Sequence, residues 1–127
     1  MKTRSLGESF RCAVQGVKAV LSTERNMRIH FIAAASVLAA AGALGVSMVE
    51  LACLALAIAL VLICELANTA LELICDIACP TWEIRVKTVK DIAAGTVLVS
   101  AAWATVVGAA VLGPKLVPVA RALLRLL

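Results

Sequence analysis

The residues best suited to chemistry lie in one stretch of the chain, residues 65–76, which holds three acids and an amide. The stretch continues an apolar run, residues 51–64, that contains no charged residue. At about 100° per residue in a helix, the polar side chains of the stretch fall within a stripe roughly 100° wide. Its members are Glu65, Asn68, Thr69, Glu72 and Asp76. Glu65 and Glu72 lie nearly above one another, about 10 Å apart along the axis, and Asp76 lies about 6 Å further on.

Acids in so apolar a helix need a partner or a use. A charged side chain at the centre of a membrane helix costs about 2.5–3.5 kcal/mol on insertion scales. A single acid would suit a polar seam between packed helices, or a position close enough to the surface to reach water. An aligned row of Glu, Asn, Glu and Asp is instead the pattern of a functional site, and we interpret it as one.

Composition indicates the class of protein around this site. The chain has 127 residues, of which 63% are hydrophobic and 16% charged, and its mean hydropathy is +1.04. These values are typical of a small polytopic membrane protein, so we expect one integral-membrane domain over residues 1–127 and no nucleic-acid partner. The five cysteines are odd in number and lie in or beside apolar segments, which predicts packing residues and no disulfide framework.

Apolar segments predict three transmembrane helices, at about 29–49, 51–77 and 92–113. Before them, apolar residues at helical spacing predict an amphipathic helix at about 5–22 that lies in the membrane interface. The expected architecture is therefore an all-α membrane protein with one interfacial helix and three spans, assembled as an oligomeric helix bundle. The N-terminal segment lacks the apolar region of a signal peptide.

The links between these helices are predicted to be short. We expect a tight turn at Ser47–Glu50 and one polar loop, residues 79–91, that begins where Pro80 stops the second span. The sequence Gly113-Pro114 is expected to end the third span. His30, at the edge of the first span, is interpreted as a membrane-interface residue because no His or Cys that could share a metal lies near it in sequence.

Lysine and arginine predict the orientation. Six precede the first span, three lie in the 79–91 loop, and none lies in the 47–50 turn. The positive-inside rule therefore predicts that the N-terminus and the 79–91 loop are cytoplasmic, in a multi-pass protein of the inner membrane. The C-terminal tail conflicts with this rule, because it would lie outside yet carries Lys115, Arg121 and Arg125. We expect the tail to lie along the outer headgroups.

This topology brings acids and a lysine to the cytoplasmic side, which is what phosphoryl transfer requires. That reaction needs carboxylates to hold Mg²⁺, a cation for the phosphates and a base near the accepting hydroxyl. The residues concerned are Glu24, Glu65, Glu72, Asp76, Lys90 and Asp91. No Gly-rich nucleotide loop is present. From the residues alone, a lipid kinase is only marginally favoured over a small proton- or cation-coupled transporter.

Two motif blocks lie at a specific spacing. The first is Glu65-x-x-Asn68-Thr69-Ala70-x-Glu72-x-x-x-Asp76, and fourteen residues after it comes Lys90-Asp91-Ile92-Ala93-Ala94-Gly95. With three spans, these blocks closely resemble the small prokaryotic diacylglycerol kinase and undecaprenol kinase family. Weaker support comes from Ser9-Phe10-x-x-Ala13-x-x-Gly16 and Glu24-x-Asn26-x-Arg28-Ile29-His30.

The resemblance implies a homotrimeric membrane enzyme that phosphorylates a lipid alcohol with MgATP. Glu65 stands where the family has its catalytic base, and Asn68 stands beside it. The same resemblance implies metal-binding and nucleotide-binding roles for Glu24 and Glu72, nucleotide contacts for Lys90 and Asp91, and a supporting role for Asp76.

The chain also departs from the family. Its loop reads Pro80-Thr81-Trp82-Glu83 where the family usually has a stretch like Pro-Glu-Tyr-His. Trp82 can still offer an aromatic face to adenine, so we include it among the candidate nucleotide contacts. The block at residues 24–30 and the block at residues 90–95 are similar to those of the branch that prefers undecaprenol, so undecaprenol is the expected substrate. Diacylglycerol, phosphorylated by the same mechanism, is the alternative.

Overall fold

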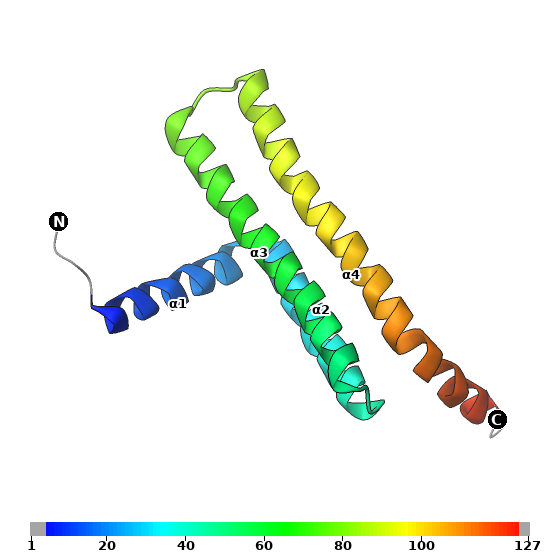
Figure 1. The fold of residues 1–127 in the computed structure, drawn as a ribbon. Coiled ribbons are helices and arrows are strands. Elements are labelled where there is room, and N and C mark those ends of the chain that lie inside the picture. The colour runs from blue at the N-terminus through cyan, green and yellow to red at the C-terminus, as the bar shows by residue number, and fades with distance from the viewer. Residues whose placement is uncertain (1–4, 125–127) are drawn as a thin grey trace.

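The computed structural model describes residues 5–124, and these residues form an all-helical fold of four helices. In chain order they are α1 (Leu6–Thr23), α2 (Arg25–Ala43), α3 (Met48–Ala78) and α4 (Ile84–Leu124). The helices α2, α3 and α4 lie side by side, and α1 points away from them (Figure 1). Each of these three is long and apolar enough to cross a membrane, with mean hydropathies of 1.2, 2.5 and 1.9. The predicted all-α class with three candidate membrane spans is confirmed for the described residues, and the oligomeric bundle stays a prediction.

The helix α1 begins with a capping box. Ser5 Oγ accepts a hydrogen bond from the backbone N–H of Glu8 at 3.2 Å, and the Glu8 carboxylate accepts one from the backbone N–H of Ser5 at 2.9 Å. None of its residues is buried, and the apolar Leu6 and Phe10 are largely exposed. An isolated helix with an exposed apolar face suits the headgroup region of a membrane, as the sequence predicts.

The turn between α2 and α3 lies earlier than the predicted 47–50. Gly45 adopts a backbone φ of +60° just after α2 ends, a left-handed conformation that a glycine takes without strain. Ser47 then caps α3, and Glu50 completes a second capping box with it. Ser47–Glu50 is therefore the start of a helix, because Ser and Glu three residues apart satisfy the first N–H groups of that helix.

One face of α3 is buried in the central half of the helix. It is apolar at Leu54, Ala57 and Val61, and it becomes polar at Glu65 and Asn68. The apolar end packs in a cluster where α2, α3 and α4 meet, centred on Ala41, Leu54 and Leu112. Small and branched side chains hold the three helices together at that end, so the polar residues lie beyond a packed base.

The loop between α3 and α4 is shorter than predicted. The helix α3 ends at Ala78, before Pro80 as expected, but α4 already begins at Ile84. Lys87 and Asp91, which were assigned to the loop, form an ion pair of 2.6 Å one helical turn apart on α4. An ion pair at this spacing stabilises a helix, although the charge content of the segment suggested a loop.

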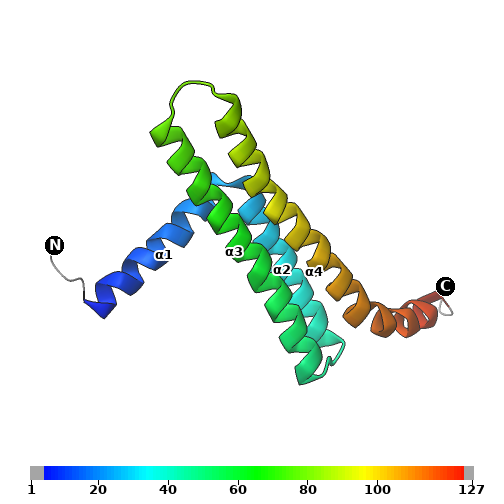
Figure 2. The same cartoon turned by 45° about the horizontal axis from the view of Figure 1, so that its top comes forward.

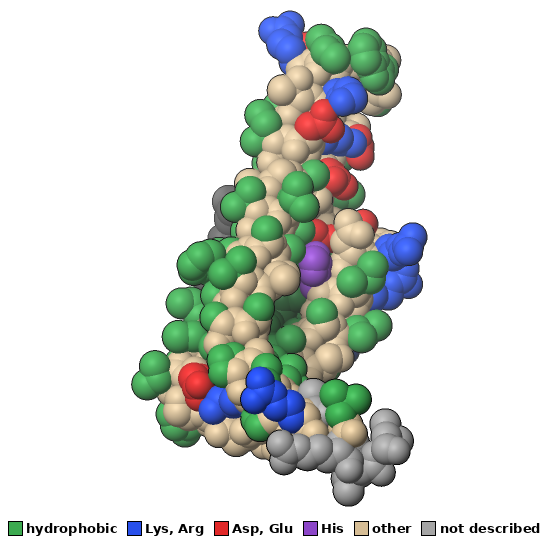
Figure 3. All heavy atoms as spheres, turned by 90° about the vertical axis from the view of Figure 1, so that its right-hand side faces the viewer, with side chains coloured by type: hydrophobic (Ala, Val, Ile, Leu, Met, Phe, Trp, Pro, Cys, Tyr) green, Lys and Arg blue, Asp and Glu red, His purple; other side chains and the backbone are tan. Residues whose placement is uncertain are grey.

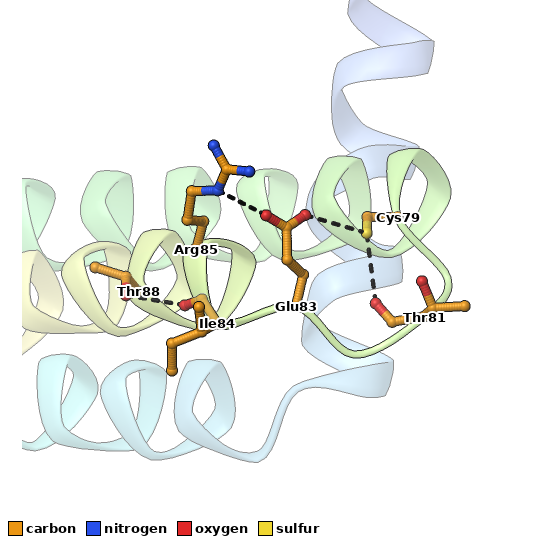
Figure 4. Close-up of polar contacts among 6 residues, drawn as sticks. All are labelled: Cys79, Thr81, Glu83, Ile84, Arg85 and Thr88. Carbon is orange, nitrogen blue, oxygen red and sulfur yellow. Dashed lines mark hydrogen bonds and ion pairs between the residues drawn. The ribbon is translucent and has the colours of Figure 1, made fainter.

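Figure 4 shows how this loop turns. The two Glu83 carboxylate oxygens face different partners: one accepts from Arg85 Nε at 2.8 Å, and the other lies 3.8 Å from Cys79 Sγ. Cys79 Sγ also lies 3.4 Å from the carbonyl oxygen of Thr81. These contacts join the two ends of the loop, and Thr88 bonds back to Ile84 within the first turns of α4.

The prediction that Gly113-Pro114 ends the last helix is wrong. The helix α4 continues through Pro114 and Pro118 to Leu124. A proline inside a helix removes one backbone hydrogen bond and kinks the axis, and a helix that remains apolar on both sides can continue past it. Figure 2 shows the last part of α4 turned away from the direction of the rest.

Lys115 is not a free charge. Its ammonium group lies 3.3 Å from the Glu50 carboxylate, so α4 is joined to the first turn of α3. The pair offsets one of the three cations that conflict with the positive-inside rule. Arg121 is exposed on the last turns of α4, and Arg125 lies outside the described residues.

Candidate active site

The centre of the candidate site is a buried carboxylate. Glu65 is only 2% exposed and Asn68 only 8% exposed, although both are polar residues of a long apolar helix. Glu65 Oε2 and Asn68 Oδ1 are buried and have no hydrogen-bond partner among the described residues. An unpaired buried polar atom is costly in any protein, so two adjacent ones need an explanation such as a ligand.

Two hydrogen bonds run along α3 next to these unpaired oxygens. Asn68 Nδ2 donates to Glu72 Oε1 at 3.0 Å, and Thr69 Oγ1 donates to the backbone carbonyl of Glu65 at 3.1 Å. Asn68 therefore contacts Glu72 directly and lies one turn from Glu65 on the same helix. This confirms that the predicted polar stripe lies on one face of α3.

Two residues from the start of α2 approach the same face. Glu24, which joins α1 to α2, and His30 lie within electrostatic range of Glu65, as does Glu72. Glu24 lies far from α3 in sequence, so the packing of α2 against α3 is what brings it close. The three glutamates that the sequence analysis selected are therefore neighbours in space.

A cavity of about 270 Å³ opens in front of Glu65 and Asn68. Its other lining residues come from α2 and α4, and those from α4 are all apolar. They are Asn26, Ile29, His30, Ala94, Val97, Leu98 and Ala101. The unpaired carboxylate and amide are thus at the wall of a space large enough for a small polar group of a ligand.

A second cavity, of about 190 Å³, adjoins the first and is almost entirely apolar. The two share His30 and Ala101, and the second runs towards the packed end of the bundle. Its lining combines small residues, such as Ala57, Ala104 and Gly108, with larger aliphatic ones such as Leu54 and Leu62. Figure 3 looks onto this side of the molecule, where charged side chains gather over the end that carries the loop and the hollowed middle is largely apolar.

Asp76 and Lys90 form an ion pair across the α3–α4 loop. Lys90 Nζ donates to Asp76 Oδ1 at 2.5 Å, and Lys90 also lies within electrostatic range of Glu72. The pair gives Asp76 a defined contact, which the sequence did not reveal. Asp76 holds the ammonium group of Lys90 at the outer end of the row of acids.

Two of the candidate nucleotide contacts lie apart from the buried residues. Asp91 is exposed and pairs with Lys87, while Trp82 is 80% exposed in the short loop. Trp82 lies in the loop itself, and Asp91 directly follows Lys90 in the first turns of α4. Their assignment to the nucleotide stays a prediction.

The carboxylates fit a magnesium ion that also binds phosphate. Within residues 5–124 no group of three Asp, Glu, His or Cys side chains is arranged to enclose a metal by itself. Mg²⁺ is usually held by one or two carboxylates together with substrate phosphates, so two glutamates are sufficient. Glu72 uses Oε1 for Asn68, which leaves its other carboxylate oxygen for such an ion.

His30 is the cavity residue that sequence reasoning missed. It was interpreted as an interface residue because no second ligand lies near it in sequence, yet it lines both cavities and lies near Glu65. The available signal was that His30 closes the block Glu24-x-Asn26-x-Arg28-Ile29-His30, but the local pattern did not determine which face of the helix meets α3.

Comparison with known proteins agrees with this geometry. The family model described as prokaryotic diacylglycerol kinase matches residues 11–112, which include the whole candidate site. The chain therefore belongs to the prokaryotic diacylglycerol kinase family. The resemblance read from the two motif blocks is confirmed.

Two curated relatives carry different substrate names. The chain is 42% identical over 109 residues to a protein from Synechocystis sp. named diacylglycerol kinase, a match that covers 85% of this chain and 62% of that protein. It is 34% identical over 109 residues to a Bacillus subtilis protein named undecaprenol kinase, covering 86% of this chain and 89% of that protein. The chain thus spans less than two thirds of the first relative's length and most of the second's.

The ion pair predicts a positioning role for Asp76. We expect Asp76→Asn to raise the KM for ATP by no more than about fivefold, because an exposed pair contributes little and Lys90 keeps its charge. Lys90→Met, which removes the charge itself, should raise it much more. Steady-state kinetics against ATP measures both, and Glu83→Gln, in the neighbouring loop pair, is the matched control. Equal effects of the Asp76 and Lys90 variants would contradict the role.

Proposed function

We propose that this protein transfers the γ-phosphoryl group of ATP to the hydroxyl of a membrane lipid alcohol. The observation that carries the proposal is the unpaired Glu65 carboxylate at the wall of a polar cavity that continues into an apolar one. A hydroxyl with an apolar chain fits both halves of that space. Membership of the prokaryotic diacylglycerol kinase family supports the same activity, with ATP as the donor.

In this proposal Glu65 is the general base. The hydroxyl oxygen attacks the γ-phosphorus of ATP, its proton passes to the Glu65 carboxylate, and the bond from phosphorus to the bridging oxygen of ADP breaks. ATP is confined to water while the alcohol approaches from the bilayer, so the base must lie between them. Glu65 lies about 10 Å deeper than Glu72 on the same helix, which places it on the lipid side of the phosphates.

The shallower residues would bind the nucleotide. Glu24 and Glu72 would hold Mg²⁺, which offsets the negative charge of the phosphates when it is bound. Lys90, held by Asp76, provides a cation at the same end of the bundle. Asp91 and Trp82 would contact the remainder of ATP from the loop end.

Undecaprenol is the substrate that we favour. It carries one chain, and the apolar cavity of about 190 Å³ that adjoins the cavity at Glu65 is one continuous space lined by aliphatic and small side chains. The residues of the 24–30 and 90–95 blocks support the same choice, as does the 89% coverage of the Bacillus subtilis relative named undecaprenol kinase. Diacylglycerol is the second candidate, because the 42% identical relative is named for it.

The proposed setting is the inner membrane, with the N-terminus and the α3–α4 loop in the cytoplasm. ATP is available on that side, and the loop end carries the residues assigned to it. The apolar α2, α3 and α4 fit a multi-pass membrane protein. The exposed α1 would lie in the cytoplasmic headgroups beside Glu24.

Removal of the base tests the mechanism. Glu65→Gln should lower kcat by about 10²–10⁴-fold, the usual contribution of general-base assistance. The affinities for ATP and Mg²⁺ should change little, since other residues hold them. Phosphate incorporation into lipid in mixed micelles measures kcat, and ATP binding is measured separately. A Gln variant that binds ATP, elutes like the parent and turns over at a similar rate would leave the mechanism without its base.

The metal assignment is tested by two further variants. Glu72→Gln or Glu24→Gln removes a charge while keeping the shape, so each should increase the Mg²⁺ concentration needed for half-maximal turnover. A Mg²⁺ titration at fixed ATP measures this shift, with Glu8→Gln on the exposed start of α1 as the control. If either site variant followed the parent titration, that residue would not be a ligand.

A homotrimer is the proposed assembly. The three helices of one chain leave large apolar side chains exposed on α3 and α4, and the Ala- and Gly-rich surfaces permit close contacts between helices. We expect native mass measurement in mild detergent to give three chains per active particle. Activity confined to a monomeric fraction would contradict the trimer.

A further inference from the structure

We infer that His30 positions the catalytic carboxylate, by donating a ring N–H hydrogen bond to Glu65 when the substrate hydroxyl is in place. The inference rests on the proposed function, since it assigns a role within that reaction. The role is new, because the resemblance to the kinase family implies no catalytic or binding role for His30.

The need for such a donor follows from Glu65 itself. Its side chain is 2% exposed, and Oε2 has no partner among the described residues. A carboxylate that serves as a base must present one oxygen to the hydroxyl, and a hydrogen bond to the other oxygen fixes its rotation. Without that bond the carboxylate could turn about its last side-chain torsion and lose the alignment that the reaction needs.

The Thr69 hydroxyl and one of the two N–H groups of the Asn68 side chain, both on the same helix as Glu65, already have other acceptors. The Asn68 side-chain amide donates to Glu72, and the Thr69 hydroxyl donates to the backbone carbonyl of Glu65. The α4 residues that line the polar cavity offer none, since they are Ala94, Val97, Leu98 and Ala101. A side-chain donor that approaches Glu65 across the cavity from another helix must therefore come from α2.

Two α2 side chains that line this cavity carry N–H groups, Asn26 and His30. Asn26 is exposed, one turn nearer the water. His30 is half-buried, lies within electrostatic range of Glu65 and also lines the apolar cavity. The imidazole therefore lies at the boundary between the two cavities, where the hydroxyl end of a lipid alcohol would be held. At least one ring nitrogen carries a hydrogen in either charge state, so the role does not require a protonated ring.

The test compares two substitutions with opposite properties. His30→Leu keeps a side chain of similar size but removes the N–H donor. His30→Gln keeps an N–H donor at a similar distance from the backbone. We expect the Leu variant to lose about 10–100-fold in kcat with an unchanged KM for ATP, the size of effect that misplacement of a reacting group causes. The Gln variant should stay within about fivefold of the parent. Ser36→Val, which alters an exposed polar residue on the same helix, is the control.

A packing role predicts the reverse order, because Leu then replaces His30 better than Gln does. A Leu variant as active as the parent, a Gln variant no better than Leu, or a parallel rise in the KM for ATP would each overturn the inference. Introduced into the Glu65→Gln protein, His30→Leu should cause less than about a threefold further loss, since the two residues act as one unit. Full additivity would also overturn it.

These outcomes are distinct from a failure of the proposed function. If the parent protein phosphorylated no lipid alcohol, the proposed function would fail before any variant was compared. If the parent is active and Glu65→Gln is not, the His30 variants alone decide the inference.

Discussion

The structure depends on the burial of one carboxylate in an otherwise apolar helix. Glu65 is costly there, because its Oε2 atom has no partner in the described part of the chain. The apolar cluster around Leu54 holds the three helices at the other end, so the bundle does not rely on Glu65 for packing. A residue that costs free energy while other residues maintain the fold is best understood through the ligand group that completes it, which we propose is a lipid hydroxyl.

The position of Glu65 along α3 orders the rest of the site. Towards the loop, Asn68, Glu72 and the Asp76–Lys90 pair form a polar path to the water, where phosphates and a metal ion can be held. In the other direction the same helix borders the apolar cavity, where a chain can lie. In the proposed function, this helix separates a nucleotide side from a lipid side, and Glu65, the proposed base, lies at the boundary.

The sequence predicted the parts that depend on local periodicity. Helical spacing and hydropathy were enough to place Glu65 and Glu72 on one face of an apolar helix and to predict four helices. The limits came from contacts between distant residues. The pairs Lys90–Asp76 and Lys115–Glu50 join α3 to α4, and the place of His30 depends on how α2 meets α3. The start of α4 at Ile84 was missed because the charged residues that follow it suggested a loop. Its continuation past Pro114 was missed because proline suggested a helix end, whereas a kink accommodates the proline.

The most direct measurement is phosphoryl transfer by the purified protein in mixed micelles, with ATP labelled in its γ-phosphoryl group. Undecaprenol, diacylglycerol and glycerol would be offered separately, with and without Mg²⁺. We expect Mg²⁺-dependent label in the extracted lipid, more with undecaprenol than with diacylglycerol, and none in glycerol, which has no chain to occupy the apolar cavity. A protein that remains folded and binds ATP, yet labels neither lipid, would contradict the account.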